Sequence, residues 1–180
     1  YRLVKTSEAS SIGSRGFRNY AQRHANYGDV RYSDFLQNPG WVKIFERVPG
    51  AKVEGDGAPS NSTVIAEVQM NDPTQNQTFK YRQLVTANQN GEFEMTVPYS
   101  TSGYDDVTRD SGYANSSVRA VSDYTFVAYQ QQLVSGTDTS PRLSYQAWTD
   151  KAQVTESQVI GINNSTVTVT MEKAETGLQR

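Results

Sequence analysis

Residues 90–97 read Asn-Gly-Glu-Phe-Glu-Met-Thr-Val and contain the clearest strand pattern in the sequence. An Asn-Gly pair favours the positive φ angles of a tight hairpin turn. After the turn, apolar and polar side chains alternate with the period of two that a β-strand has, so Phe93, Met95 and Val97 are expected to point into a core. The stretch therefore predicts a hairpin turn followed by a strand with one buried face.

Short segments with similar patterns recur at intervals of roughly ten residues, separated by residues typical of turns. They are residues 51–53, 64–70, 79–81, 118–121, 124–129, 143–147, 154–160 and 166–171. A series of short strands of this kind is typical of an all-β domain. The sequence predicts a mainly β fold, either a prealbumin- or immunoglobulin-like β-sandwich or a partly open barrel.

The first 48 residues follow a different pattern. Tyr1-Arg2-Leu3-Val4 reads as the end of a strand, and residues 41–48 are apolar on both faces, which suits a central strand. Between these segments, aromatic residues and a histidine recur at spacings of three, four and three, which predicts a short helical insertion ending at Gly28. These residues are Phe17, Tyr20, His24 and Tyr27.

Composition limits the chemistry that the chain can perform. With 36% hydrophobic and 20% charged residues it can bury a core, so it is not a disordered tail. It contains no cysteine, which excludes disulfides and thiolate chemistry. His24 is the one histidine, so a multi-histidine metal site is excluded and a Ser-His-Asp triad would have to use it. No apolar run reaches the ~18 residues that a membrane span needs.

The charge of the chain is uneven. Residues 1–50 hold eight Lys and Arg against four Asp and Glu, a net charge of +4, whereas the remainder has a net charge of −6. The basic and aromatic side chains between residues 15 and 32 could form a packed helix with solvated charges, face anionic lipid headgroups, or bind nucleic acid. The acidity of the whole chain argues against nucleic acid as a partner.

Acidic residues supply the candidates for a metal site. Asp105, Asp106 and Asp110 lie on a Gly- and Ser-containing loop and could begin an oxygen-ligand site, although a hard cation such as calcium needs about six ligands. Glu92 and Glu94 share one face of one strand, whereas glycosidase carboxylates face each other across a cleft, so both are expected to be solvated. The sequence has neither a phosphate-binding loop nor a nucleophile elbow, and we predict no catalytic or cofactor-binding residue.

The sequence also carries five Asn-x-Ser/Thr sequons, which give some support to an extracytoplasmic location. They start at Asn61, Asn76, Asn115, Asn163 and Asn164. The chain begins at a tyrosine without a signal-peptide pattern, which we interpret as a start inside a longer protein.

Two segments resemble a known family. Tyr1-Arg2-Leu3-Val4 together with residues 41–51 (Trp-Val-Lys-Ile-Phe-Glu-Arg-Val-Pro-Gly-Ala) is similar to the stretch just after the catalytic core of the oligosaccharyltransferase catalytic subunit. Residues 48–53 and 90–99 resemble prealbumin-like β-sandwiches, and residues 99–105 look like the C-terminal end of the archaeal, halophile-type transferases. The similarity covers most of the chain and is densest from residue 41 to residue 129.

This resemblance implies that residues 1–48 are the trailing edge of a central core with a basic and aromatic helical insertion, and that residues 49–180 are a peripheral β-sandwich. The parent enzyme would transfer a lipid-linked oligosaccharide to the Asn of sequons at the extracytoplasmic face of the membrane, with a divalent metal, Mn or Mg. The partners would be the catalytic core and membrane domain of the same chain and, as a further candidate, the acceptor protein. No catalytic residue carries over, because the family's Trp-Trp-Asp motif is absent and Trp148-Thr149-Asp150 does not match it.

Two other functions stay open from the sequence. The prealbumin-like motifs are also typical of adhesion or spacer modules of cell-surface proteins. The tyrosine content and the loop acids are compatible with a carbohydrate-binding β-sandwich.

Overall fold

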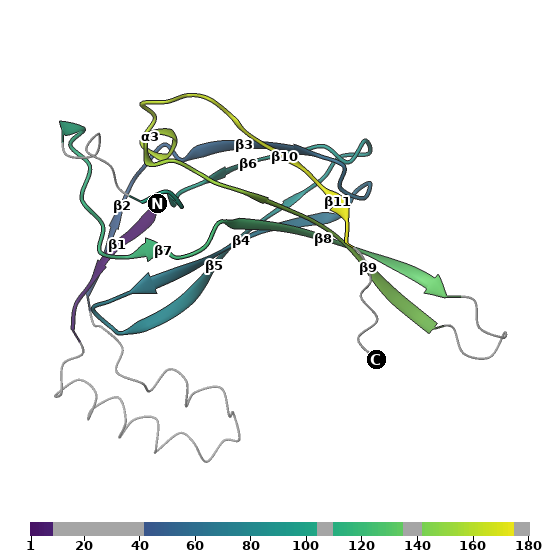
Figure 1. The fold of residues 1–180 in the computed structure, drawn as a ribbon, viewed down its shortest axis with the longest axis horizontal. Coiled ribbons are helices and arrows are strands. Elements are labelled where there is room, and N and C mark those ends of the chain that lie inside the picture. The colour runs from purple at the N-terminus through teal and green to yellow at the C-terminus, as the bar shows by residue number, and fades with distance from the viewer. Residues whose placement is uncertain (9–41, 104–109, 135–141, 175–180) are drawn as a thin grey trace, which may run out of the picture.

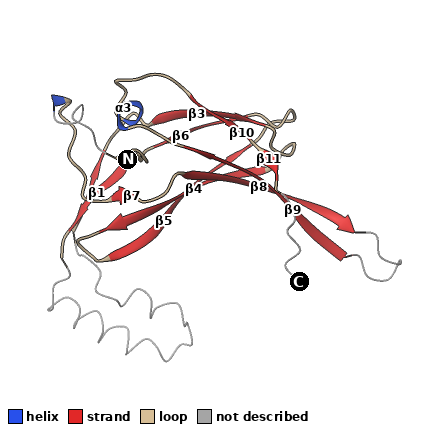
Figure 2. Ribbon diagram, in the orientation of Figure 1, coloured by secondary structure: helices blue, strands red, loops and turns tan. Residues whose placement is uncertain are grey.

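The computed structural model describes residues 1–8, 42–103, 110–134 and 142–174, with the backbone alone for residues 132–134 and 142–143. In these ranges the chain is mainly β, with very little helix (Figures 1 and 2). The predicted helical insertion at residues 17–28 lies outside the described residues, so it stays a prediction.

The larger sheet is built from antiparallel neighbours in the order β11-β9-β8-β4-β5, with a short strand, β7, paired to the end of β4. Its strands are β4 (Thr63–Asp72), β5 (Gln77–Thr86), β7 (Arg119–Ala120), β8 (Tyr124–Val134), β9 (Arg142–Ala152) and β11 (Glu172–Lys173). The strands predicted at residues 64–70, 79–81, 124–129 and 143–147 are confirmed, and each is longer than the pattern indicated.

The smaller sheet contains β3 (Ala51–Asp56) between β6 (Phe93–Val97) and β10 (Val167–Thr170). β6 runs antiparallel to β3, whereas β10 runs parallel to it. Phe93, Met95 and Val97 are buried as predicted, and the Phe93 ring lies 6.3 Å from the ring of Phe126 on the larger sheet.

Side chains from both sheets form one hydrophobic core. On β4, every second side chain from Val64 to Met70 is almost completely buried, as the alternation predicted. In the described ranges none of the sheets closes on itself. The architecture is therefore β-sandwich-like (Figure 1).

The turn before β6 was predicted to form a hairpin, and this prediction is wrong, because β5 and β6 belong to different sheets. The turn chemistry itself is confirmed. Gly91 has a φ of +81°, and the Asn88 carboxamide oxygen accepts hydrogen bonds from the backbone N–H groups of Asn90 and Glu92, at 2.8 and 3.0 Å. Turn residues specify the local backbone, but they do not specify which strand the chain pairs with afterwards.

Residues 154–160 were predicted to form a strand, and this prediction is also wrong. They contain the short helix α3 (Glu156–Val159). Thr155 and Gln158 form a capping box, in which the Gln158 N–H donates to the Thr155 hydroxyl at 3.3 Å and the Thr155 N–H donates to the Gln158 side chain at 2.9 Å. The Thr-x-x-Gln signature was present in the sequence and outweighs the apolar pattern.

A two-stranded antiparallel sheet joins β1 (Arg2–Thr6) to β2 (Lys43–Glu46), with a bulge between Leu3 and Lys5. β1 packs into the domain, and Leu3 belongs to its core. β2 was predicted to be a central strand, which is wrong for this chain, because in the described ranges it pairs with β1 alone and its side chains are largely exposed.

Candidate functional site

A buried ion-pair network fixes β1 to the sandwich. The Arg2 side chain is fully buried, and its guanidinium lies 2.6 Å from the Glu156 carboxylate, which is also fully buried. On its other side Arg2 lies 3.0 Å from Glu46 of β2, which is 20% exposed. A buried charge is tolerated when it is paired and hydrogen-bonded, so this network ties the start of the chain, β2 and α3 into one unit.

Hydrogen bonds extend this attachment along β1. The Leu3 N–H donates to the Tyr99 phenol oxygen at 2.9 Å, and the Thr6 hydroxyl donates to the Asp72 carboxylate at 2.6 Å. Burial raises the pKa of Tyr99, and the Leu3 N–H offsets part of that shift. Burial also raises the pKa of Tyr124 well above its ordinary value. These tyrosines therefore stay neutral at physiological pH and act as packing and hydrogen-bonding groups.

Among the described residues, a group of exposed apolar side chains lies on β2, at Val42 just before it and at Tyr1, which precedes β1. Tyr1 is 79% exposed, Val42 56%, Ile44 52% and Phe45 57%. Consecutive side chains of a strand point to opposite faces, so Ile44 and Phe45 leave apolar area exposed on both faces of β2. We call these four residues the β2 surface.

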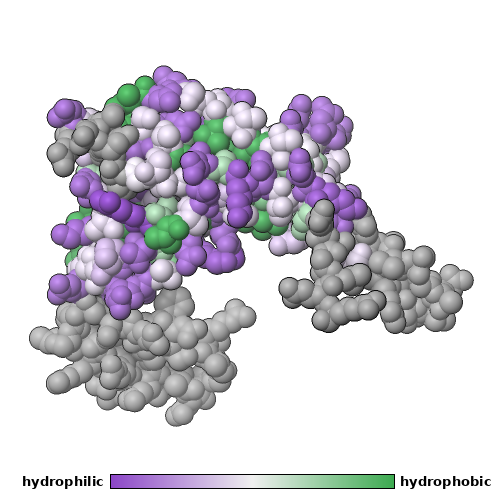
Figure 3. Space-filling model, in the orientation of Figure 1, coloured by the Kyte–Doolittle hydropathy of each residue, from purple (hydrophilic) through white to green (hydrophobic). Residues whose placement is uncertain are grey.

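Exposed apolar side chains also lie on the outer face of the larger sheet, where Leu84 stands opposite Ile65 and Tyr129 is a diagonal neighbour of Tyr145. On the face drawn in Figure 3, hydrophobic side chains appear in small separate areas between hydrophilic ones. Isolated exposed apolar residues of this kind are ordinary on protein surfaces and require no partner. Exposure on two faces of one short strand is a stronger signal of a missing neighbour.

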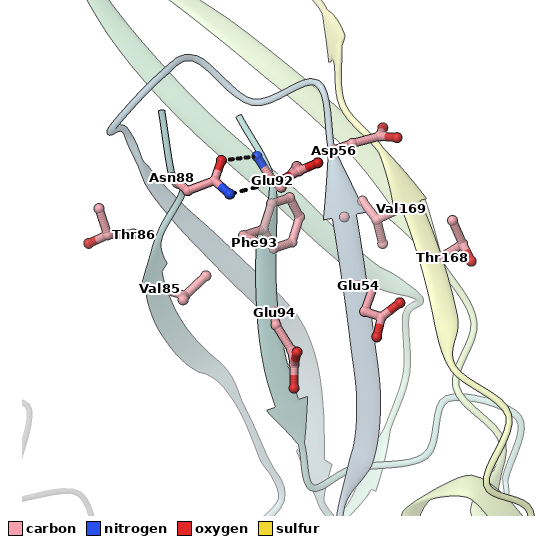
Figure 4. A pocket seen from close by; sticks show the side chains of 11 residues that line it. Glu54, Asp56, Val85, Thr86, Asn88, Glu92, Phe93, Glu94, Thr168 and Val169 are labelled. Carbon is pink, nitrogen blue, oxygen red and sulfur yellow. Dashed lines mark hydrogen bonds between the residues drawn. The ribbon is translucent and has the colours of Figure 1, made fainter. Parts of the chain in front are cut away.

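A hollow lies at one end of the smaller sheet and has a volume of about 610 Å³. Glu54 and Glu94 face each other there on neighbouring strands, and both pair with the exposed Lys52, at 2.6 and 3.6 Å. Figure 4 shows Asn88 turned toward Glu92, with which it forms a 2.8 Å hydrogen bond. Glu92 and Glu94 are both exposed, as predicted, but only Glu94 lies on β6, which begins just after Glu92. Three of the acids that line the hollow, Glu54, Glu92 and Glu94, are therefore already engaged by neighbouring side chains.

The predicted metal candidates are not brought together in the described residues. Asp110 is exposed, whereas Asp105 and Asp106 lie outside the described ranges. Within those ranges no three His, Cys, Asp or Glu side chains are grouped to hold a metal ion. The resemblance implies a divalent metal for the parent enzyme. The described residues of this chain contain no set of side chains that fits such a metal.

Sequence reasoning missed the roles of Arg2 and Glu156. No sequence motif connects the two residues, which are 154 positions apart. A charged residue in a short apolar strand was the available signal for Arg2, because such a residue is buried only when it is paired.

No helix in the described part of the chain is long and apolar enough to cross a membrane. Residues 50–167 match the model of a family described as the archaeal glycosylation protein B long peripheral domain. The chain is 45% identical, over 176 residues, to the dolichyl-monophosphooligosaccharide–protein glycotransferase AglB of Haloferax volcanii. The match covers 97% of this chain but 16% of that relative, so the chain spans a small part of the length of the protein it resembles.

Solved structures of an archaeal oligosaccharyltransferase have a similar fold. The chain is similar to the archaeal oligosaccharyltransferase AglB from Archaeoglobus fulgidus in complex with an inhibitory peptide and a dolichol-phosphate, with a TM-score of 0.60 and 20% identity over 96% of this chain and 20% of that one. A second structure of the Archaeoglobus enzyme, in complex with Zn and sulfate, gives a TM-score of 0.59 at 19% identity, over 94% of this chain and 22% of that one. At this identity the likeness supports the fold alone. Together with the Haloferax match, it does not favour the adhesion or spacer function.

Proposed function

The chain belongs to the family of archaeal glycosylation protein B long peripheral domains, and from this premise we propose that it is a supporting, non-catalytic part of an oligosaccharyltransferase. The parent protein would transfer a lipid-linked oligosaccharide to the Asn of Asn-x-Ser/Thr sequons. Residues 1–48 would be the trailing edge of its central core and residues 49–180 the peripheral β-sandwich. The family match at residues 50–167 supports this division.

One observation carries the supporting role: the β2 surface is apolar and exposed, while β1 beside it is anchored in the sandwich by Arg2. A rigid module with an exposed apolar surface at one end is suited to pack against another body. Burying an Ile or a Phe side chain from full exposure contributes roughly 1.5–3 kcal/mol. Ile44 and Phe45 are a little over half exposed, so burying what remains would contribute about half of that amount for each side chain. The catalytic core of the same polypeptide is the partner that the Haloferax relative suggests, since most of its length lies outside the matched region.

Further parts of the proposal rest on the sequence. The module would lie on the extracytoplasmic side of the membrane, where sequons can be modified. The divalent metal of the parent would be held by residues outside this chain. Within the β-sandwich-like architecture, the turn and strand motifs favour the prealbumin- or immunoglobulin-like class, and the helical spacing of residues 17–27 supports a helical insertion.

The experiment compares two sets of exposed apolar side chains in the full-length parent. Ile44 and Phe45 are changed together to serine, and Leu84→Ser serves as the control, because Leu84 is exposed on the larger sheet away from the β2 surface. In the 180-residue chain both variants should melt like the wild type. In the parent, the Ile44 and Phe45 double variant should have a lower melting temperature than the wild type and should yield less folded enzyme. The rate of oligosaccharide transfer per folded molecule should stay unchanged.

Two results would contradict the proposal. One is saturable binding of a sequon peptide or of a lipid-linked oligosaccharide by the 180-residue chain alone, since a supporting module has no such site. The other is a parent protein that melts at the same temperature with Ile44 and Phe45 as with serines in their places.

A further inference from the structure

The backbone of β2 has one satisfied side and one open side. The Ser7 N–H donates to the Val42 carbonyl at 2.9 Å, and the Val42 N–H donates to the Ser7 hydroxyl at 3.2 Å, so the backbone of Val42 faces β1. Successive residues of a strand turn their N–H and C=O groups to alternate sides. The backbone groups of Lys43 and Phe45 therefore point away from β1.

In the described ranges this sheet has no third strand. The far side of β1 is already covered, because the N–H groups of Ser117 and Val118 donate to the Val4 carbonyl, at 3.0 and 3.4 Å. The outer side of β2 is thus the open edge of the sheet. Figure 1 shows β2 beside β1 at the end of the molecule where the N-terminus lies.

β2 carries charged residues at its two ends, Lys43 and Glu46, but its two central side chains do not have the pattern of an edge strand that meets water. Natural edge strands are protected by charges, prolines or bulges, because an exposed apolar edge pairs with other chains. β2 instead exposes Ile44 on one face and Phe45 on the other. A strand that is apolar on both faces is typical of the interior of a sheet that is covered on both sides.

The charges around this edge are mostly positive. Lys5, Lys43 and Arg47 are exposed, whereas Glu46 is engaged by Arg2. A strand that pairs here would be favoured by acidic side chains opposite Lys43 and Arg47, since opposite charges on directly paired residues stabilise a sheet.

Resting on the proposed function, we propose that the outer edge of β2 is a sheet-continuation site. Its occupant is an extended strand of the same, longer polypeptide, with apolar side chains on both faces and at least one acidic side chain near Lys43. The chain spans 16% of its Haloferax relative, so most of such a parent protein is available to supply that strand. Pairing would make β2 an interior strand, as its sequence indicates, and covalent linkage would give the two strands a high effective concentration.

The test uses backbone chemistry, which separates edge pairing from simple burial of side chains. Lys43→Pro removes an N–H that points to the open edge, while the ladder to β1 keeps its hydrogen bonds; proline is tolerated at such an edge position. Lys43→Ala is the matched control, because it removes the same charge and leaves the N–H in place. Both variants are made in the 180-residue chain and in the full-length parent.

The first readout is amide hydrogen exchange of peptides that contain residues 43–45. The Lys43 and Phe45 amides, which point to the open edge, should exchange about ten times more slowly in the parent than in the 180-residue chain, whereas the Ile44 amide faces β1 in both. The second readout is thermal stability. Lys43→Pro should lower the melting temperature of the parent well below that of Lys43→Ala, whereas the two variants should melt together in the 180-residue chain.

Two outcomes would overturn the inference. One is equal exchange of residues 43–45 in the two proteins while the parent still transfers oligosaccharide, which would leave the proposed function intact. The other is a 180-residue chain that forms dimers in sedimentation experiments and becomes monomeric with Lys43→Pro, which would make a second copy the occupant. A failure of the proposed function would be seen in a different measurement: the parent protein would transfer no oligosaccharide, whether or not the amides of residues 43–45 are protected from exchange.

Discussion

Replacing Arg2 with methionine should be among the most damaging single changes in this chain. The substitution keeps the length and much of the volume of the side chain, but it leaves the Glu156 carboxylate fully buried without the guanidinium 2.6 Å away. Removing one partner of a buried pair costs about 3–5 kcal/mol. Glu46 adds little to this cost, because it is 20% exposed and its carboxylate can reach water.

For a domain of this size, 1 kcal/mol shifts the melting temperature by about 2–4 °C, so Arg2→Met should lower it by roughly 6–20 °C. Urea denaturation, monitored by circular dichroism, measures the loss of unfolding free energy. Urea is uncharged, so it does not screen the ion pair as a salt denaturant would. A second variant, Arg2→Met with Glu156→Met, replaces both charges by apolar side chains and should recover more than half of the loss.

The control for this experiment is Lys52→Met, which breaks an exposed ion pair with Glu54 and Glu94. Exposed pairs contribute little to stability, so this variant should unfold at nearly the wild-type urea concentration. The reasoning would be refuted if Arg2→Met unfolded no earlier than Lys52→Met, or if the double variant were less stable than Arg2→Met alone.

Three further changes have expected outcomes. Burial raises the pKa of Tyr124 in the folded chain. The neutral Tyr124 side chain therefore stabilises the fold fully below the ordinary tyrosine pKa of about 10, and this stabilisation is lost as the pH rises through the raised pKa of the folded chain. Tyr124→Phe should make the loss of unfolding free energy at alkaline pH less steep. A Cβ at Gly55 would overlap the Phe93 ring, so Gly55→Ala should cost about 1–3 kcal/mol in urea denaturation, and it should cost less in a Phe93→Leu background. Gly91→Ala combines a φ of +81° with an overlap on the Ala58 carbonyl; it should lower the melting temperature, whereas Gly112→Ala, where the φ of +79° is the sole obstacle, should lower it less.

The sequence was sufficient to predict strands wherever one face is buried. β4 and β6 show this most clearly, because each alternates between core and solvent along its whole length. The period of two is a local property, and a buried face is enough to preserve it. The helical stretch at Glu156–Val159 was misread because a run of so few residues fits either period, and its capping box was the better guide.

The features that depend on distant partners could not be predicted from the sequence. The Asn88–Gly91 turn was placed correctly, but the pairing of the strands beside it was not, since each of them finds its neighbours elsewhere in the chain. The pair of Arg2 with Glu156 has no local pattern at all. For β2, the sequence indicates an interior strand and the chain exposes it, which is the mismatch expected when a strand's neighbours lie outside the chain.

Because β10 pairs with the much earlier strand β3, the smaller sheet cannot be completed until the end of the domain has been synthesised. β10 pairs with one edge of β3, and Glu156 forms an ion pair with Arg2. Both of these partners come late in the chain. At ribosomal rates of about 5–20 residues per second, the 154 positions between Arg2 and Glu156 take roughly 8–30 s to synthesise. During that interval Arg2 has Glu46 within reach but not Glu156, and the edge of β3 beside Val53 lacks β10. A stop or a protease cut between Glu156 and residue 167 would keep the partner of Arg2 but remove β10, so the edge of β3 beside Val53 would stay unpaired and the sandwich should lose stability.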